Sequence, residues 1–258
     1  MTKVNVGGVR LEFERIDSPD SELPTIVMLH EGLGSIGLWR DFPAQLAAAT
    51  STCVVLYSRK GYGRSDPLTG PRLVDYMHEE ALQVLPGLLE QLQIERPVLF
   101  GHSDGASIAL IHAGGSGRAV AGAIAMAPHV MVEDISITSI AAAREAYRTT
   151  DLRERLARYH EDVDGAFWGW NEIWLNPAFR AWNIEEFLPR IECPVLAIQG
   201  LRDEYGTLEQ IERIARHVSR FERLTLETCR HSPHRDRPKE VLEAVTQWLK
   251  QLPGSGAA

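Results

Sequence analysis

The pentapeptide GHSDG at 101–105 contains the side chain with the clearest chemistry, because it places Ser103 between two glycines. It follows the apolar run 97–102 and precedes a helical pattern over 104–113. A tight turn from strand to helix crowds the neighbouring Cβ atoms, so flanking glycines allow a serine to stand there with its hydroxyl exposed. The pattern alone is weak, since ordinary residue frequencies give about one random match in ten such chains. Its position between a strand and a helix predicts that Ser103 is a nucleophile.

A serine hydroxyl attacks poorly until a base accepts its proton. Asp203 comes shortly after the apolar run 194–200, and His231 comes directly after the run 223–229. The chain order is therefore serine, acid, histidine, each just beyond a predicted strand. We expect His231 to accept the Ser103 proton, and Asp203 to hold the imidazole tautomer and stabilise its cation.

The acid and the base each have a competitor nearby. Glu204 directly follows Asp203 and is the next candidate for the acid. His234 stands three residues after His231 and is the alternative base. We favour His231 because it directly follows the predicted strand.

The loop after the first buried run, 25–30, holds His30, Glu31 and Gly32. The tetrahedral intermediate of acyl transfer needs two backbone N–H donors, one beside the nucleophile and one from an early loop. We predict that Asp104 supplies the first donor and Gly32 the second, because a residue without Cβ permits close approach. His30 is expected to orient the loop. The Glu31 carboxylate is expected to point away from the pocket, where it would oppose an anionic intermediate.

The elements that must position these residues follow a repeating order. The segment VRLEFERI alternates apolar and polar residues after Gly7-Gly8, which predicts an opening hairpin. Apolar runs then alternate with helical patterns such as 73–92. The runs expected to form buried strands span 25–30, 52–58, 97–102, 120–127 and 194–200. This order predicts an α/β protein with a doubly wound, mostly parallel sheet, whose ligands collect at the carboxyl ends of the strands.

One stretch, 131–190, interrupts the alternation with several helical patterns and is too long for a simple connection. We predict a small helical cap over the strand ends, with at least one of its tryptophans facing a substrate pocket. The expected pocket residues are His30, Glu31, His129, Trp168, Trp170 and Trp174. The expected division is a core of 1–130 and 191–252, the cap at 131–190, and a flexible tail at 253–258.

A hypothesis from another class must also be weighed. Gly32, Gly34 and Gly37 satisfy G-x-G-x-x-G after a strand, the pattern of an NAD(P)-dependent oxidoreductase. The acid expected about 20 residues further on is missing, since Ser58-Arg59 stand there. A cofactor loop also leaves the serine, the late acid and the late histidine unexplained. A non-catalytic hydrolase-like binding protein is disfavoured because all three side chains are present.

The composition of the chain limits the classes of partner that it could bind. The chain has 258 residues and a net charge of −8, which argues against nucleic acid or an anionic membrane as partner. Its three cysteines are far apart, as expected for free thiols in a reducing compartment. The N-terminus lacks a signal-peptide pattern, and no apolar run reaches about 18 residues. We expect a cytoplasmic monomer or homodimer that binds a small-molecule substrate and needs no cofactor or metal.

In these residues, the chain resembles the capped α/β-hydrolase superfamily over nearly its whole length. The resemblance rests on His30-x-Gly32 with Trp39, the loop 58–65, the pentapeptide 101–105, Gly200-x-x-Asp203 and His231-x-x-His234. The superfamily implies oxyanion donors at Gly32 and Asp104. The chain departs from the usual pattern in having Glu31 for glycine, Ser58 for aspartate, and Arg230 for the glycine before the histidine.

The resemblance implies acyl transfer through an acyl-enzyme on Ser103. Carboxylic esters are the expected substrates, with lactones and thioesters close behind, and the tryptophans favour an apolar or aromatic group. Hydrolysis of a carbon–carbon bond in a diketone uses a similar triad and stays open as an alternative. Haloalkane and epoxide chemistry is disfavoured because on this fold it normally uses an aspartate as nucleophile.

Overall fold

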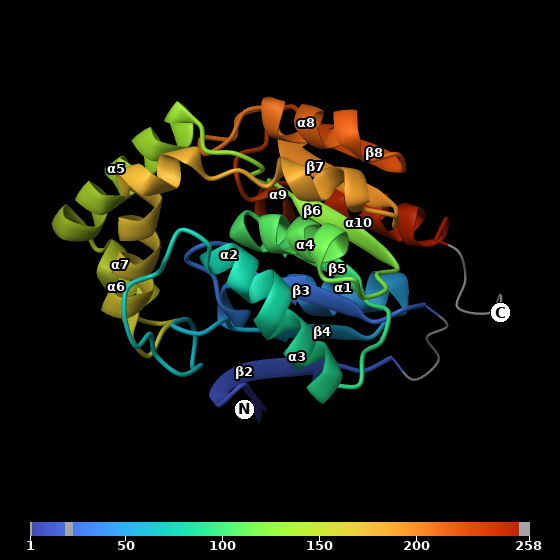
Figure 1. Ribbon diagram of the computed structural model, residues 1–258, viewed down its shortest axis with the longest axis horizontal. Coiled ribbons are helices and arrows are strands. Elements are labelled where there is room, and N and C mark those ends of the chain that lie inside the picture. Colours follow the sequence, from blue (N-terminus) through green and yellow to red (C-terminus); the bar gives the residue numbers. More distant parts are fainter. Residues whose placement is uncertain (1, 19–22, 253–258) are drawn as a thin grey trace.

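A single eight-stranded sheet forms the centre of the protein (Figure 1). The computed structural model describes residues 2–18 and 23–252, so the expected tail at 253–258 lies outside the described residues. The strands are β1 (Thr2–Val6), β2 (Val9–Ile16), β3 (Ile26–Leu29), β4 (Val54–Tyr57), β5 (Val98–His102), β6 (Gly122–Met126), β7 (Val195–Gly200) and β8 (Phe221–Leu226). Their order is β1-β2-β4-β3-β5-β6-β7-β8. The first two strands pair antiparallel, β2 pairs antiparallel with β4, and all later pairs are parallel.

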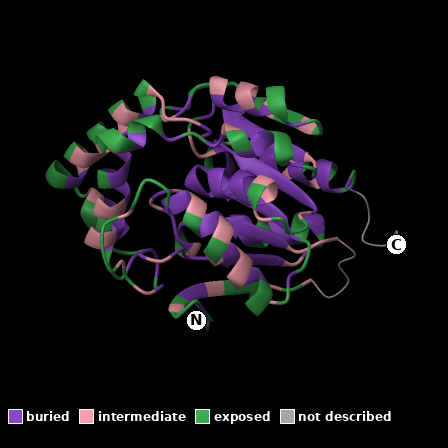
Figure 2. Ribbon diagram, in the orientation of Figure 1, coloured by how far each residue is buried: buried purple, intermediate pink, exposed green. Residues whose placement is uncertain are grey.

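Helices cover both faces of the sheet because alternate residues of each buried strand point to opposite sides. In β3, Val27 and Leu29 join the core under one helical layer, while Ile26 and Met28 join the core under the other. The first layer contains α2 (Tyr76–Glu79), the π-helical turn η2 (Glu80–Val84), α3 (Leu85–Gln91), α4 (Asp104–Gly115) and α8 (Glu209–His217). The second contains α1 (Phe42–Thr50) and α10 (Pro238–Leu249). Strands β3, β4, β5, β6 and β7, between these layers, are buried (Figure 2).

The segment between β6 and β7 is helical. It comprises α5 (Asp134–Thr149), α6 (Leu152–Leu156), α7 (Val163–Trp174), and the 3-10 turns η3 (Pro177–Ala181) and η4 (Glu185–Arg190). Helices α5, α6 and α7 lie beside the sheet at one end, in yellow-green in Figure 1. This is an α/β-hydrolase fold, as the alternation of apolar runs and helical patterns predicts.

Two local boundaries differ from the sequence expectation. The run 223–229 is strand only as far as Leu226, where its pairing with β7 ends, so His231 follows a turn and not the strand itself. The glycine-rich stretch after β3 leads into the 3-10 turn η1 (Ile36–Trp39) before α1 begins. A dinucleotide-binding loop would instead open directly into a helix whose N-terminus faces the pyrophosphate.

Three further features concern the chain as a whole. Cys53, Cys193 and Cys229 are free, and the latter two are buried. A short helix, α9 (Pro233–Asp236), connects the loop after β8 to α10. In the part of the chain that the structure describes, no helix is both long and apolar enough to cross a bilayer.

Candidate active site

Ser103 stands on a strained turn between β5 and α4. Its backbone has φ 53° and ψ −119°, a combination that L-residues rarely adopt, and its N–H donates to the Met126 carbonyl at 2.9 Å. A Cβ at Gly101 would lie 2.2 Å from the Gly105 carbonyl oxygen, and one at Gly105 would lie 2.0 Å from the Leu29 carbonyl oxygen. Both glycines are therefore required by close backbone packing around the serine.

Three side chains from three strand ends form one hydrogen-bonded chain. The Ser103 Oγ lies 2.9 Å from His231 Nε2, and His231 Nδ1 lies 2.9 and 2.8 Å from the two Asp203 oxygens. Because an ionised carboxylate only accepts hydrogen bonds, Nδ1 carries the proton and Nε2 is free to accept one from the serine. The structure thus brings together Ser103, His231 and Asp203, which are far apart in the sequence.

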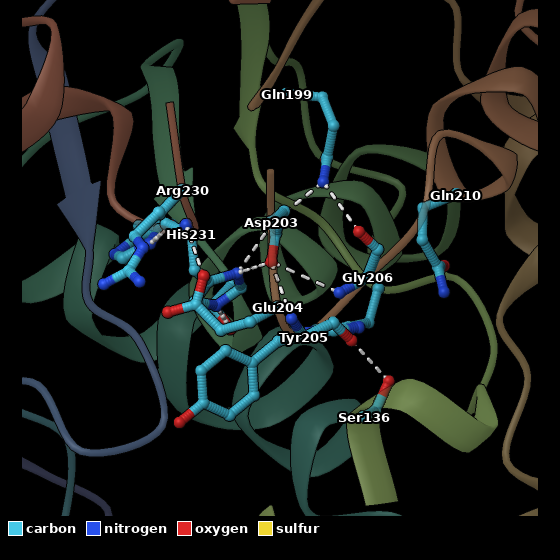
Figure 3. Close-up of polar contacts among 12 residues, drawn as sticks. Ser136, Gln199, Asp203, Glu204, Tyr205, Gly206, Gln210, Arg230 and His231 are labelled. Atoms are coloured by element: carbon cyan, nitrogen blue, oxygen red, sulfur yellow. Dashed lines mark hydrogen bonds and ion pairs between the residues drawn. The ribbon is translucent and has the colours of Figure 1, made fainter. Parts of the chain in front are cut away.

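Asp203 is held by the loop that follows β7 (Figure 3). The backbone N–H groups of Tyr205 and Gly206 donate to its Oδ1 at 2.8 and 3.2 Å, and Gln199 Nε2 donates to its Oδ2 at 2.8 Å. Burial raises the pKa of Asp203, but the charge and hydrogen bond of His231 and these donors lower it further, so the net shift is downward. The carboxylate is therefore ionised and oriented before any substrate arrives.

The interaction between Asp203 and His231 also determines how basic the His231 imidazole is. Burial lowers the pKa of His231, while the charge and hydrogen bond of Asp203 raise it more, so the net shift is above the ordinary 6.5. A histidine with this shift is a stronger base than a free imidazole and keeps an acquired proton more firmly.

The competing residues occupy other places. His234 is buried against Trp39 and Phe42, and among the described residues both of its ring nitrogens lack a hydrogen-bond partner. Burial is the main cause that lowers the pKa of His234 well below 6.5. Glu204 Oε2 accepts from the backbone N–H of His231 at 3.3 Å, so it contacts the base loop and not the imidazole.

His30 lies beneath the loop that follows β3 and does not line the cavity beside Ser103, contrary to the sequence expectation for the pocket. The backbone N–H of Arg59 donates to His30 Nε2 at 3.0 Å, so the ring proton is on Nδ1, which donates to the Glu31 carbonyl at 2.7 Å. Burial, and then the charge of Arg59, lower the pKa of His30 well below 6.5. The ring is therefore neutral and orients the loop.

Glu31 is among the residues that line the cavity, and its carboxylate, which we expected to point away from the pocket, contacts residues outside that lining. Its carboxylate lies 3.4 Å from His102 Nδ1 and 3.5 Å from Arg235 Nη2. Burial raises the pKa of Glu31, but the hydrogen bond and charge of His102 and the charge of Arg235 lower it well below its usual range. His102 Nε2 in turn donates to the His231 carbonyl at 2.7 Å. Sequence reasoning missed these contacts of His102, a variable position of the serine motif.

Asp104 makes side-chain contacts that the sequence did not predict. Its Oδ2 accepts from the Tyr76 hydroxyl at 2.6 Å and lies 3.7 Å from Arg59 Nη2. The Trp174 indole N–H donates to the same Tyr76 hydroxyl at 3.1 Å. The buried Asp104 carboxylate is thus linked to Trp174 of the inserted segment through the Tyr76 hydroxyl.

A cavity of about 110 Å³ opens beside Ser103. Its lining residues are Glu31, Gly32, Leu33, Ser103, Asp104, His129, Ile140, Trp170, Trp174, Tyr205 and His231. His129 packs against Trp174 with ring centroids 5.0 Å apart, and burial is the main cause that lowers the pKa of His129 to about 4. The neutral His129 and the mostly apolar remainder of the lining therefore leave few charged groups beside the serine.

The expectation for Trp168 differs from the structure. Trp168 does not line the cavity but packs against Tyr147 and Phe167, with the Arg148 guanidinium over its ring. Trp170, on another side of α7, lies so close to the loop after β3 that a Cβ on Gly32 would be 2.2 Å from its indole nitrogen. The difference arises because residues two apart on a helix point to different sides.

The lining residues Leu33, Ile140 and Tyr205 were not foreseen. Leu33 and Tyr205 each follow a predicted site residue by one or two positions, which is a usable signal. Ile140 comes from α5, and no local pattern distinguishes it from the other apolar residues of that helix.

This geometry can generate a serine alkoxide, deliver it to a carbonyl carbon and hold the resulting oxyanion at the N-terminus of α4. Fold and site together define a hydrolase with a serine, a histidine and an aspartate. The chain matches the profile of the Alpha/beta hydrolase family over residues 26–244, and it belongs to this family.

Individual relatives are distant. The chain is 23% identical to a proline iminopeptidase of Lactobacillus crispatus (strain ST1), over 93% of this chain and 94% of that protein. Among solved structures it resembles the enol-lactonase from Burkholderia xenovorans LB400, with a TM-score of 0.77, 20% identity, and coverage of 97% of this chain and 100% of that one. It also resembles an esterase (EaEST) from Exiguobacterium antarcticum, with a TM-score of 0.77, 17% identity, and coverage of 97% and 99%. At these identities the solved structures support the fold alone.

Proposed function

We propose that this protein is a serine hydrolase that cleaves carboxylic esters, including lactones and thioesters, of small apolar acyl groups. The observation that carries this proposal is the continuous hydrogen-bonded chain from Asp203 through His231 to Ser103, which ends in a mostly apolar cavity. A polarised nucleophile at the wall of a mostly apolar pocket suits attack on an uncharged carbonyl group.

The proposed reaction has two halves. Ser103 Oγ bonds to the carbonyl carbon while His231 takes its proton, and the backbone N–H groups of Gly32 and Asp104 hold the oxyanion. The alkoxide leaving group then departs with the proton from His231. In the second half, water gives a proton to His231 and its hydroxyl to the acyl carbon, and Ser103 leaves as the proton returns to it.

The size of the cavity limits the acyl group. An apolar cavity of about 150 Å³ admits a molecule such as benzene. The space beside Ser103 is about 110 Å³, so it fits an acyl group of a few carbon atoms.

Hydrolysis of an N-terminal amide is a second candidate, because the relative from Lactobacillus crispatus is named a proline iminopeptidase. An aminopeptidase must bind a substrate ammonium group, which calls for an unpaired carboxylate in the pocket. The acidic residues that line the cavity are Glu31 and Asp104, and both already face cations, Arg235 and Arg59 respectively. This pairing favours an uncharged acyl group over an amino acid.

The test combines a covalent probe with a substrate panel. We expect a fluorophosphonate to label the wild-type protein and to leave Ser103→Ala unlabelled. p-Nitrophenyl acetate and butyrate should react with kcat/KM at least about tenfold above that of the octanoate, because each misplaced methylene weakens the fit.

Undiminished labelling of Ser103→Ala would overturn the nucleophile. Faster hydrolysis of prolyl-p-nitroanilide than of any ester would replace the ester proposal by amide hydrolysis. Turnover of a diketone with no ester hydrolysis would support carbon–carbon cleavage instead.

A further inference from the structure

We propose that Arg59 is a positioning residue for the oxyanion hole, which aims the Gly32 N–H at the cavity by holding the Glu31 carbonyl from behind. This inference rests on the proposed function, since it assigns a role at the same serine. Arg59 lies just after β4, and its guanidinium is buried beneath the loop that follows β3.

The first step of the argument is the geometry of one peptide unit. The Glu31 carbonyl and the Gly32 N–H belong to the same peptide plane, and the described residues contain no cis peptide bond. In a trans peptide these two groups point in opposite directions. Whatever fixes the direction of the carbonyl therefore fixes the direction of the N–H.

Three donors hold this carbonyl. Arg59 Nη2 donates to the Glu31 oxygen at 2.9 Å, His30 Nδ1 donates to it at 2.7 Å, and the backbone N–H of Gly34 donates to it at 3.0 Å. The two side-chain donors are fully buried, while Gly32 on the opposite side lines the cavity. The carbonyl is thus fixed on the protein side, and the N–H is directed toward the space beside Ser103.

The same guanidinium also contacts the segment that carries the second donor. Arg59 Nη2 lies 3.7 Å from Asp104 Oδ2 and donates to the His30 carbonyl at 3.3 Å. Asp104 is the residue whose backbone N–H follows the nucleophile. One charged group therefore couples both sides of the proposed oxyanion hole.

The buried positive charge of Arg59 indicates a role other than packing. Burial lowers the pKa of Arg59, but Tyr62 and Asp104 raise it more, so the guanidinium is charged although the residue is only 1% exposed. Among the described residues, its Nε and Nη1 have no hydrogen-bond partner. A residue needed only for packing would be better served by an apolar side chain, because a buried charge with unpaired donors is destabilising. A cation behind the peptide instead polarises its N–H and favours a nearby developing anion.

The experiment compares substitutions of Arg59 with a matched control. Arg72 is the control. Its guanidinium lies 4.7 Å from the centre of the Tyr62 ring, and the guanidinium of Arg59 lies 5.1 Å from the centre of the same ring. Arg72, however, donates a hydrogen bond to the Lys60 carbonyl. With p-nitrophenyl acetate we expect Arg59→Met to lower kcat by about 10- to 100-fold and to change KM by less than about threefold. Removal of an oxyanion donor acts on the transition state and not on ground-state binding.

Two further measurements keep the outcome decisive. Affinity for an alkylboronic acid, whose tetrahedral adduct places an oxygen in the oxyanion hole, should fall in parallel with kcat. Arg59→Lys keeps the positive charge but lacks the planar guanidinium, so it should fold even if Arg59→Met does not. Its kcat should lie between the kcat of Arg59→Met and that of the wild type.

A change in KM alone, an unchanged boronate affinity, or an equal loss of kcat in Arg72→Met would overturn the role of Arg59. Absence of Ser103-dependent turnover in the wild type would instead overturn the proposed function, so the two failures are distinguishable.

Discussion

His231 and Asp203 act as an electrostatic unit whose properties come from burial. Asp203 is 8% exposed and accepts hydrogen bonds from Gln199, two backbone N–H groups and the imidazole, which keep it ionised in spite of the cost of desolvation. Its charge is the main cause that raises the pKa of His231 against the opposing effect of burial. Removal of that charge leaves burial as the larger influence.

At the residue scale, ester hydrolysis should therefore have an acidic limb that reflects His231. The neutral imidazole is the base, so a pKa above 6.5 means that kcat/KM falls as the pH falls through that raised value. Asp203→Asn should lower the pKa of His231, which NMR titration of the ring would show, and should lower kcat by about 10³- to 10⁴-fold.

The control is His234→Ala, which should keep the acidic limb and much of the turnover, since His234 does not contact Ser103 or Asp203. A limb that disappears in His234→Ala but persists in His231→Ala would exchange the two roles.

At the scale of elements, the site lies between the strand ends and two inserted helices, α5 with Ile140 and α7 with two tryptophans. The turn after β5 and the loops after β7 and β8 supply the reacting side chains, and the loop after β3 supplies Gly32. Helix α7 closes this edge with Trp170 and Trp174, and Trp170 is packed tightly on Gly32. The helix therefore sets both the depth of the cavity and the room available at Gly32.

The preference for acyl-chain length should depend on the tryptophans of α7 that form this wall of the cavity. Trp170→Ala removes a large ring from the cavity and should raise the ratio of kcat/KM for p-nitrophenyl octanoate to that for butyrate by about tenfold. Trp168→Ala removes a tryptophan of the same helix that does not line the cavity, and it should leave this ratio unchanged. Equal shifts in both variants would mean that the helix is only loosened, and the cavity wall would then be assigned wrongly.

At the scale of the whole molecule, the mostly buried sheet separates two apolar cores that do not share residues. The core on the side of α4 continues into the inserted segment through residues such as Phe167, Trp174 and Phe179. The inserted helices are thus held by the same apolar packing as the sheet, which favours a cavity of defined shape.

The net charge of −8 makes a separate prediction for the whole molecule. Because like charges repel, the protein should neither shift duplex DNA in a gel nor sediment with phosphatidylserine vesicles at physiological salt. Light scattering should give the mass of one chain or of two. Salt-sensitive binding to either polyanion would contradict the assignment of a small molecule as the main partner.

Much of the fold and the reacting triplet could be predicted from local pattern. Apolar runs of strand length, separated by helical periodicity, predict a parallel sheet, and the carboxyl ends of such strands meet at one edge. Ser103, Asp203 and His231 each follow a strand at that edge, so their meeting is a consequence of topology. The side chains of Glu31 and Asp104 could not be placed this way, because their partners lie on segments with no sequence signal that links them.

The sequence by itself determined which chemical groups the strand ends present and in what order, because strand periodicity and glycine sterics are local properties. Only the tertiary structure decided that Trp170 and not Trp168 faces the serine, and that Arg59 lies behind the Glu31 carbonyl. Those outcomes depend on how a helix is rotated against the sheet and on which buried groups satisfy one another. The packing of the whole chain determines the rotation of the helix and the pairing of the buried groups, because the residues that contact each other are far apart in the sequence.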